Sequence, residues 1–226
     1  MDLEHKLKIV LEKIEVAKKK SSFKQKVELI AATKTRDISQ IEKCYSLGVT
    51  SIGENRVQEA ENKFVDFQGF KTLKKRFIGH LQSNKINKCL DLFDTIDSVD
   101  TFKTANKINN ASQKRTQKTE CLIEVNTSGE LQKNGFSPTL SNELISCFSL
   151  QNLEIVGLMT IGPNTSDEKK IKNSFSALRD LKDKINQELG RNILKELSMG
   201  MTNDFELGVE EGSTMVRVGT GLFGSR

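Results

Sequence analysis

Hydrophobic residues along this chain recur with two different spacings. Near the N-terminus they lie three or four positions apart, with lysines and glutamates between them, at Leu3, Leu7, Val10, Leu11, Ile14 and Ala17. This spacing predicts an amphipathic helix that packs on the rest of the protein. The next apolar segment, 27–33, is a continuous run of strand length that ends at Lys34. Asp37 with Gln40 resembles a capping box, so a helix is expected from there until Gly48.

The same unit of a strand followed by a helix recurs along the chain. Seven further short apolar segments end in polar or glycine residues, at 51–55, 77–80, 93–98, 121–126, 155–160, 197–200 and 215–220. Helical patterns separate them, and the clearest follows the capping residues Ser166 and Asp167 and contains Ile171, Phe175, Leu178, Leu181 and Ile185. Eight alternating units predict an α/β protein with a single (β/α)8 TIM-type barrel and an extra N-terminal helix. A doubly wound open sheet is the alternative, since periodicity does not show whether the sheet closes.

Length and composition favour one domain that spans residues 1–226. The chain has two prolines and no tract rich in glycine and serine that would serve as a linker. Its hydrophobic content of 36% is ordinary for a protein with a buried core, and no apolar run has the length of a membrane span. The N-terminus does not resemble a signal peptide, so we expect a cytoplasmic protein. Because no exposed apolar stripe is evident, we also expect a monomer.

Residue types that would indicate other functions are scarce. The four cysteines lie far apart within apolar segments, which predicts buried, reduced thiols. Two histidines, His5 and His80, without a Cys/His cluster predict no metal site. The net charge of +5 is spread along the chain, which has one tyrosine, Tyr45, and no tryptophan, so nucleic-acid binding is not favoured. The runs Lys18–Lys20 and Lys74–Arg76 are interpreted as solvated surface charge.

Lys34 is the strongest candidate for chemistry. Ligands bind at the mouth formed by the carboxyl ends of barrel strands, and Lys34 follows the first predicted strand. A partly desolvated lysine amine can lose its proton there and form a Schiff base with an aldehyde. Most of the 35 lysines and arginines must be solvated, so position alone distinguishes Lys34. Asn55, His80 and Asn126 would lie at the same mouth. Asn55 would be a helix cap or a ligand contact, and His80 an acid/base or, more simply, a hydrogen-bonded structural residue.

The last two predicted strands suggest an anion site. Ser198, Gly219 and Thr220 read as strand-end residues, and barrels commonly build phosphate sites from the loops after strands seven and eight. Tight turns are the alternative explanation for these glycines. Alternation along the last strand points Arg217 into the barrel, toward either a structural carboxylate or a ligand. An aldehyde-binding lysine, a phosphate site and a buried arginine together suit pyridoxal 5′-phosphate (PLP), whereas aldolases usually take their barrel lysine from a later strand.

Six motifs, in order along the chain, resemble the pyridoxal phosphate homeostasis protein family: Ala32–Thr35, Gly53–Asn55, Phe77–Lys85, Gly157–Met159, Ser198–Met201 and Gly212–Thr220. The resemblance implies a fold-type III barrel like the N-terminal domain of alanine racemase, with the cofactor held as a Schiff base on Lys34. It further implies cofactor contacts from five residues, with the serine and the Gly-Thr pair at the phosphate and the arginine near the pyridine nitrogen: Asn55, Ser198, Gly219, Thr220 and Arg217. Two departures, Lys75-Arg76 for Trp-His and Arg56 for Tyr, would alter surface or partner contacts more than cofactor binding.

The resemblance implies a protein that carries or buffers PLP, maintains intracellular vitamin B6 and serves PLP-dependent apoenzymes. A slow amino-acid racemase is the alternative, and binding of a protein or RNA partner through a lysine-rich face is a third interpretation. Related racemases place a tyrosine from a second domain opposite the lysine, whereas Tyr45 lies in the helix after strand one. An arginine at the pyridine nitrogen also weakens the ring as an electron sink. We therefore assign no catalytic residue, and we read loop 129–135 as either a lid or a connection.

Overall fold

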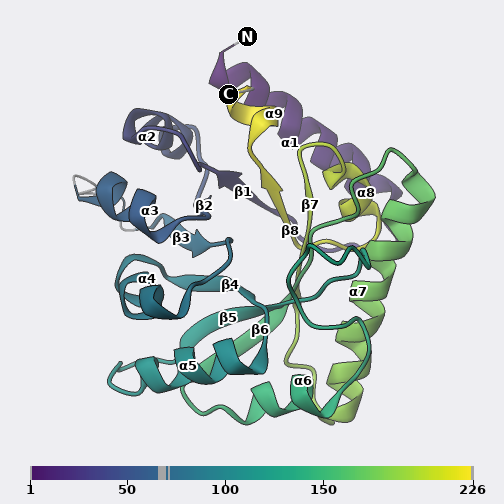
Figure 1. Ribbon diagram of the computed structural model, residues 1–226. Helices are drawn as coiled ribbons and strands as arrows, with labels where there is room; N and C mark the ends of the chain where they lie inside the picture. Colours follow the sequence, from purple (N-terminus) through teal and green to yellow (C-terminus); the bar gives the residue numbers. More distant parts are fainter. Residues whose placement is uncertain (1, 66–69, 71, 225–226) are drawn as a thin grey trace.

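Eight parallel strands close into a barrel in chain order, each paired with the next and β8 paired with β1 (Figure 1). The computed structural model describes residues 2–65, 70 and 72–224. Within them the strands are β1 (Glu28–Ala32), β2 (Ser51–Glu54), β3 (Lys74–Phe77), β4 (Thr95–Val99), β5 (Thr119–Glu124), β6 (Leu153–Met159), β7 (Glu196–Met201) and β8 (Met215–Val218). The predicted barrel is confirmed, and the open sheet is excluded.

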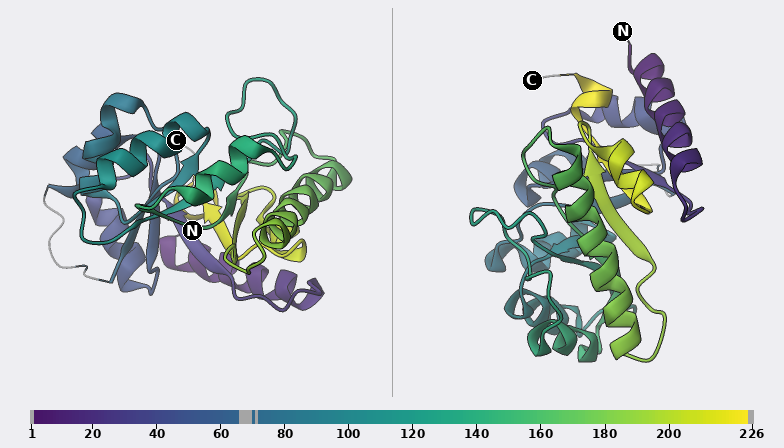
Figure 2. Two further views of the ribbon diagram at one scale, coloured as in Figure 1. Left: turned by 90° about the horizontal axis from the view of Figure 1, so that it is seen from below. Right: turned by 90° about the vertical axis from the view of Figure 1, so that its right-hand side faces the viewer.

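Helices surround the barrel and include the predicted extra helix at the N-terminus. They are α1 (Leu3–Lys20), α2 (Ile38–Ser46), α3 (Val57–Phe64), α4 (Ile86–Leu92), α5 (Phe102–Ser112), α6 (Asn142–Ser146), α7 (Glu168–Glu188), α8 (Phe205–Glu210) and α9 (Thr220–Phe223), with short 3-10 segments at Ser83–Lys85 and Cys147–Ser149. Helix α1 lies against α8 and α9, which joins the two ends of the chain (Figure 2). No helix in the described ranges is both long and apolar enough to cross a membrane.

Capping and apolar spacing explain where the helices form. The Asp37 side chain accepts a hydrogen bond from the Gln40 amide over 3.0 Å, and α2 ends just before Gly48, whose φ is +90°. Asp167 caps α7 in the same way. All five apolar positions predicted for that helix are buried. These boundaries confirm the predicted capping signals.

A small apolar layer fills the interior of the barrel. Four side chains, one each from β1, β5, β6 and β8, are 0–3% exposed and pack together: Ile30, Leu122, Met159 and Met215. A larger core lies between the outer face of the strands and the helices. The four cysteines are all buried in the structure, as predicted, and burial raises the pKa of the Cys44 thiol to about 11. The barrel interior is thus a packed core, and in barrels of this kind ligands bind at the carboxyl ends of the strands.

Charged residues close the amino-terminal end of the barrel. The Arg76 guanidinium is 2% exposed and donates to both carboxylate oxygens of Asp97 over 3.3 Å, with Glu28 at 3.1 Å. The interpretation of Lys74–Arg76 as solvated charge was therefore wrong. These residues form β3, which begins and ends three residues earlier than predicted, because the barrel interior supplies carboxylates for the arginine.

Candidate functional site

Lys34 lies in the turn between β1 and α2, two residues beyond the end of the strand. Its side chain is half-buried, and it makes no hydrogen bond or ion pair with any residue that the structure describes. The flanking Thr35 has a φ of +65°, which a β-branched residue rarely adopts. The turn thus presents an amine without a protein partner at the carboxyl end of the barrel.

A buried acid–base pair stands directly behind this turn. Glu54, at the end of β2, is fully buried, and its Oε1 accepts from the Thr33 hydroxyl and from Lys63 Nζ, both over 2.6 Å. Burial raises the pKa of Glu54, and Oε2 has no hydrogen-bond partner. This pair was not predicted from the sequence. The one indication in the sequence was the charge of Glu54 at a strand position that faces outward, where α3 covers the sheet.

Ser198 and Arg217 meet inside the barrel. Arg217 is 4% exposed, and its guanidinium donates to the Ser198 hydroxyl over 2.6 Å, to the Ser198 carbonyl over 2.8 Å and to the Thr160 carbonyl over 2.6 Å. The predicted inward direction of Arg217 is confirmed, but no described carboxylate lies within ion-pair distance. Burial lowers the pKa of this arginine.

Ser198 is placed deeper than predicted. It lies within β7 and not at its end, because the strand continues through a bulge to Met201. Gly200 makes the bulge possible with a φ of +97°. The hydroxyl that reaches the mouth is that of Thr202, which the sequence analysis left unassigned although it follows the same motif. Its Oγ1 accepts from the amides of Gly219 over 3.3 Å and Gly221 over 3.2 Å.

Gly219 and Thr220 form the turn that follows β8. The Thr220 side chain is exposed, and its backbone amide has no hydrogen-bond partner among the described residues. This turn is adjacent to the lysine turn, because β8 pairs with β1 and a Cβ on Gly219 would lie 3.4 Å from the Ala32 Cβ. Free hydrogen-bond donors therefore stand beside the free amine of Lys34.

Asn55 lies on the next strand end, and its side chain makes no hydrogen bond with the described residues. It does not cap α3, whose N-cap position is Arg56. The alternative that Asn55 is a helix cap is therefore wrong, and its amide remains available to a ligand. Gly79 packs so closely against it that a Cβ there would lie 2.2 Å from the Asn55 carbonyl oxygen.

The opposite side of the mouth carries titratable groups. His80 Nδ1 lies 3.0 Å from Asp100 Oδ2, with the His80 side chain largely exposed. Glu124, at the end of β5, is 8% exposed and shares the inward face of Leu122. Burial raises the pKa of Glu124 to about 7, and the nearby Asp100 carboxylate adds to the shift.

Loop 129–135 is tied to the end of β5. The Asn126 side chain donates to the carbonyls of Glu130 over 2.9 Å and Lys133 over 3.2 Å. Glu130 also accepts from the Asn164 amide over 3.0 Å, which links this loop to the one after β6. These hydrogen bonds fasten the loop to the ends of β5 and β6, so Asn126 shapes the rim of the mouth, and whether the loop is a lid or a connection stays open.

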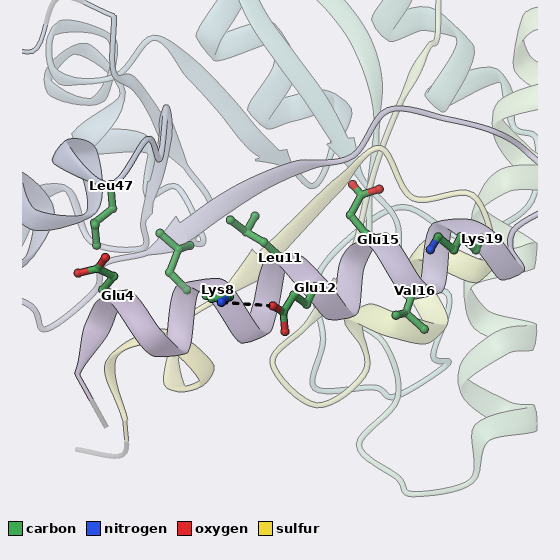
Figure 3. Close-up of a pocket in the computed structure, with 9 residues that line it drawn as sticks. Glu4, Lys8, Leu11, Glu12, Glu15, Val16, Lys19 and Leu47 are labelled. Carbon is green, nitrogen blue, oxygen red and sulfur yellow. Dashed lines mark ion pairs between the residues drawn. The ribbon is translucent and has the colours of Figure 1, made fainter.

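A groove of about 720 Å³ lies elsewhere, along the outer face of α1 (Figure 3). Leu11 and Val16, which are 44% and 50% exposed, contribute to its apolar lining, and Lys8 pairs with Glu12 at its edge. None of the predicted site residues lines it. We expected no exposed apolar stripe, and this expectation is wrong for α1, where Leu11 and Val16 are exposed. That the protein is a monomer therefore stays a prediction. No group of three metal-ligating side chains occurs among the residues described.

Comparison with known proteins shows which family the chain resembles. The family model "Alanine racemase, N-terminal domain" matches residues 7–226. The pyridoxal phosphate homeostasis protein of Aquifex aeolicus is 37% identical over 223 residues, which cover 98% of this chain and 97% of the relative. This chain belongs to the pyridoxal phosphate homeostasis protein family. The bovine family member is 36% identical over 88% of this chain and 77% of its own length.

Several solved structures have a fold similar to that of this chain. PipY of Synechococcus elongatus, a structure with PLP bound, is 30% identical with a TM-score of 0.84, covering 99% of this chain and 100% of PipY. An uncharacterised Bifidobacterium adolescentis protein is 38% identical with a TM-score of 0.87, covering 98% of this chain and 94% of that protein. Alanine racemase of Clostridium difficile, at 17% identity and a TM-score of 0.74, shares the fold, with 98% of this chain matched to 56% of the racemase.

Proposed function

We propose that this protein binds PLP at the mouth of the barrel and carries or buffers it, as part of vitamin B6 homeostasis in the cytoplasm. The observation that carries the proposal is the free Lys34 amine beside the turn at Gly219 and Thr220. An aldehyde and a phosphate on one small molecule match these two neighbouring groups. The PLP-bound PipY structure and the names of the curated relatives support the same ligand.

Each residue has a distinct role in this proposal. Lys34 would hold the cofactor covalently and reversibly through its side-chain amine, which makes no hydrogen bond or ion pair with the described residues. The amide and hydroxyl of Thr220 would hold the phosphate, and Gly219, which has no side chain, would let it approach. Thr202 fixes this turn by accepting from the Gly219 and Gly221 amides. Asn55 contacts the ring from the neighbouring strand. When bound, the cofactor supplies an electrophilic aldehyde and an aromatic ring able to delocalise charge.

Arg217 and Ser198 act at the base of this site. Arg217 stays positively charged and can only donate hydrogen bonds, so we assign it to the ring nitrogen. Ser198 holds the guanidinium in place by accepting from it over 2.6 Å. An arginine at that nitrogen keeps it unprotonated, which disfavours carbanion chemistry and suits a carrier. Curated relatives are named as homeostasis proteins and not as enzymes.

Reductive trapping tests the proposal. The pure protein is incubated with PLP, reduced with borohydride, and the modified lysine is identified by mass spectrometry. We expect one adduct on Lys34, which Lys34→Ala abolishes and which Lys43→Ala, at an exposed lysine of α2, leaves intact. An adduct on another lysine, or none, would refute the site.

A slow racemase remains the second candidate because one inward-facing acid lies across the barrel. Strand β5 is four strands from β1 in either direction, so Glu124 faces the side that carries Lys34. Tyr45 is no candidate, since its hydroxyl bonds to Thr72 over 2.7 Å. Hydrogen exchange at the α-carbon of an amino acid, lost in both Lys34→Ala and Glu124→Gln, would establish the racemase; the carrier proposal expects no exchange.

The remaining proposals concern organisation. We propose that residues 1–226 act as one domain, and that the protein is a monomer which delivers PLP to PLP-dependent apoenzymes. Light scattering coupled to gel filtration gives the oligomeric state. Activation of an apoenzyme across a dialysis membrane, compared with activation in a shared compartment, separates release into solution from direct transfer.

A further inference from the structure

The turn that carries Lys34 is held on both sides by residues of β2 and α3. The Thr33 hydroxyl, on one side of the lysine, donates to Glu54 Oε1 over 2.6 Å. The Thr35 amide, on the other side, donates to Glu59 Oε1. Neither bond involves the Lys34 side chain, so the amine is left free while the backbone around it is fixed.

Lys63 joins these two carboxylates into one network. Its ammonium donates to Glu54 Oε1 over 2.6 Å, to Glu59 Oε1 over 3.2 Å and to the Thr33 carbonyl over 2.9 Å. The Lys63 side chain is 7% exposed and Glu54 is fully buried. Charge-assisted hydrogen bonds shielded from water are stronger than neutral ones. The Glu54–Lys63–Glu59 network is therefore a firm support for the turn.

Thr35 shows that the turn needs such support. Its φ of +65° lies in the left-handed region, which disfavours a β-branched side chain. A conformation of this kind persists where the surroundings impose it. The Arg36 amide closes the turn by donating to the Thr33 carbonyl over 2.9 Å. The Thr35 amide adds the hydrogen bond to Glu59. Without it the turn can relax, and the Lys34 amine would leave its position beside the Gly219 turn.

We propose that Glu54, Lys63 and Glu59 are positioning residues for Lys34, and that they set how firmly the aldehyde is retained. This inference rests on the proposed function. No hydrogen bond between described residues joins Glu54, Lys63 or Glu59 to Thr202, Gly219 or Thr220, so loss of the network removes no direct contact of the phosphate side. The lysine turn itself bonds to the end of α9 through Arg36, which donates to the Gly224 carbonyl over 2.7 Å and does not belong to the network. Loss of the network should weaken the hold of the lysine on the aldehyde and leave phosphate binding unchanged.

Two ligands separate these effects. PLP has the aldehyde, whereas pyridoxine 5′-phosphate carries an alcohol in its place and cannot form a covalent bond to the lysine amine by condensation. The variant is Glu59→Ala, because the Glu59 side chain is 25% exposed and its loss keeps the buried Glu54–Lys63 pair. We expect PLP affinity to fall roughly ten-fold, as for loss of one charge-assisted hydrogen bond, with pyridoxine 5′-phosphate affinity unchanged.

Two further variants make the test specific. Glu59→Gln keeps an acceptor oxygen for the Thr35 amide and should recover most of the PLP affinity. Glu61→Ala removes a carboxylate from the same helix that bonds to Lys88 and not to the turn, and it should bind both ligands as the unmodified protein does.

The outcomes distinguish this inference from the proposed function. Unchanged PLP affinity in Glu59→Ala, an equal loss for both ligands, or no recovery in Glu59→Gln would overturn the positioning role alone. If the unmodified protein binds the two ligands equally tightly, the covalent hold by Lys34 is itself wrong, and the inference falls with it.

Discussion

Gly79 is the position at which one added methyl group should disturb the mouth most. A Cβ there would lie 2.2 Å from the carbonyl oxygen of Asn55, 2.6 Å from its Cα and 2.7 Å from its carbonyl carbon. All three atoms belong to the backbone, so no side chain can rotate away. Non-bonded heavy atoms need roughly 3.2 Å or more, so the ends of β2 and β3 must separate by about 1 Å.

The cost of Gly79→Ala follows from this overlap. Overpacking a close-packed core costs about 1–3 kcal/mol, and a clash between two backbones belongs at the upper end of that range. In a chain of 226 residues, a loss of about 3 kcal/mol lowers the melting temperature by roughly 6–12 °C. Urea and thermal unfolding measure both quantities. PLP affinity should fall as well, because Asn55 moves with its strand.

Gly219→Ala is the matched control at the same mouth. Its Cβ would meet the Ala32 Cβ and carbonyl oxygen at 3.4 Å, an ordinary contact, and Gly219 has a φ of −113°. This variant should cost less than about 1 kcal/mol. The packing argument is refuted if Gly79→Ala unfolds within about 1 kcal/mol of the unmodified protein, or if Gly219→Ala is equally destabilised.

Three other results are expected. Lys63→Met leaves Glu54 as an unpaired buried carboxylate and should lower the free energy of unfolding by roughly 3–5 kcal/mol, whereas adding Glu54→Gln should restore most of it in urea titrations. Burial raises the pKa of Glu124 from 4.5 to about 7, so the folded state binds an extra proton in that window. The unmodified protein should therefore lose stability relative to Glu124→Gln as pH rises through it, and a constant difference would contradict this. The buried cysteines should react with a thiol reagent only as the protein unfolds.

The repeating pattern of apolar residues was sufficient to predict eight strand and helix units, because strands and helices differ in apolar spacing and helices such as α2 and α7 begin at a capping aspartate. The same pattern was insufficient to predict the bounds of β3. The charges of Lys74–Arg76 suggest solvated surface, and the sequence does not show that Asp97 faces Arg76 across the interior. Pairing between residues far apart in sequence leaves no periodic signal. Local spacing therefore finds the elements and misses the charges that they enclose.

The candidate site divides in the same way. Lys34 and Gly219 were placed at the mouth by their position after a strand, which sequence alone reveals. Ser198 was placed too near the mouth, because the bulge at Gly200 adds residues to β7 that alternation does not anticipate. The role of Thr202 depends on hydrogen bonds to amides of another strand's turn, which only the folded chain brings together.

Packed side chains fill the interior of the barrel below its mouth. Among the described residues, the apolar layer around Ile30 and Leu122 and the buried Arg76–Asp97 pair lie between the mouth and the amino-terminal end of the barrel. A ligand that binds beside Lys34 therefore enters and leaves through the mouth at the carboxyl ends of the strands. A carrier built this way cannot fill from one side while it empties from the other, so an acceptor protein and the next free cofactor molecule compete for the same opening.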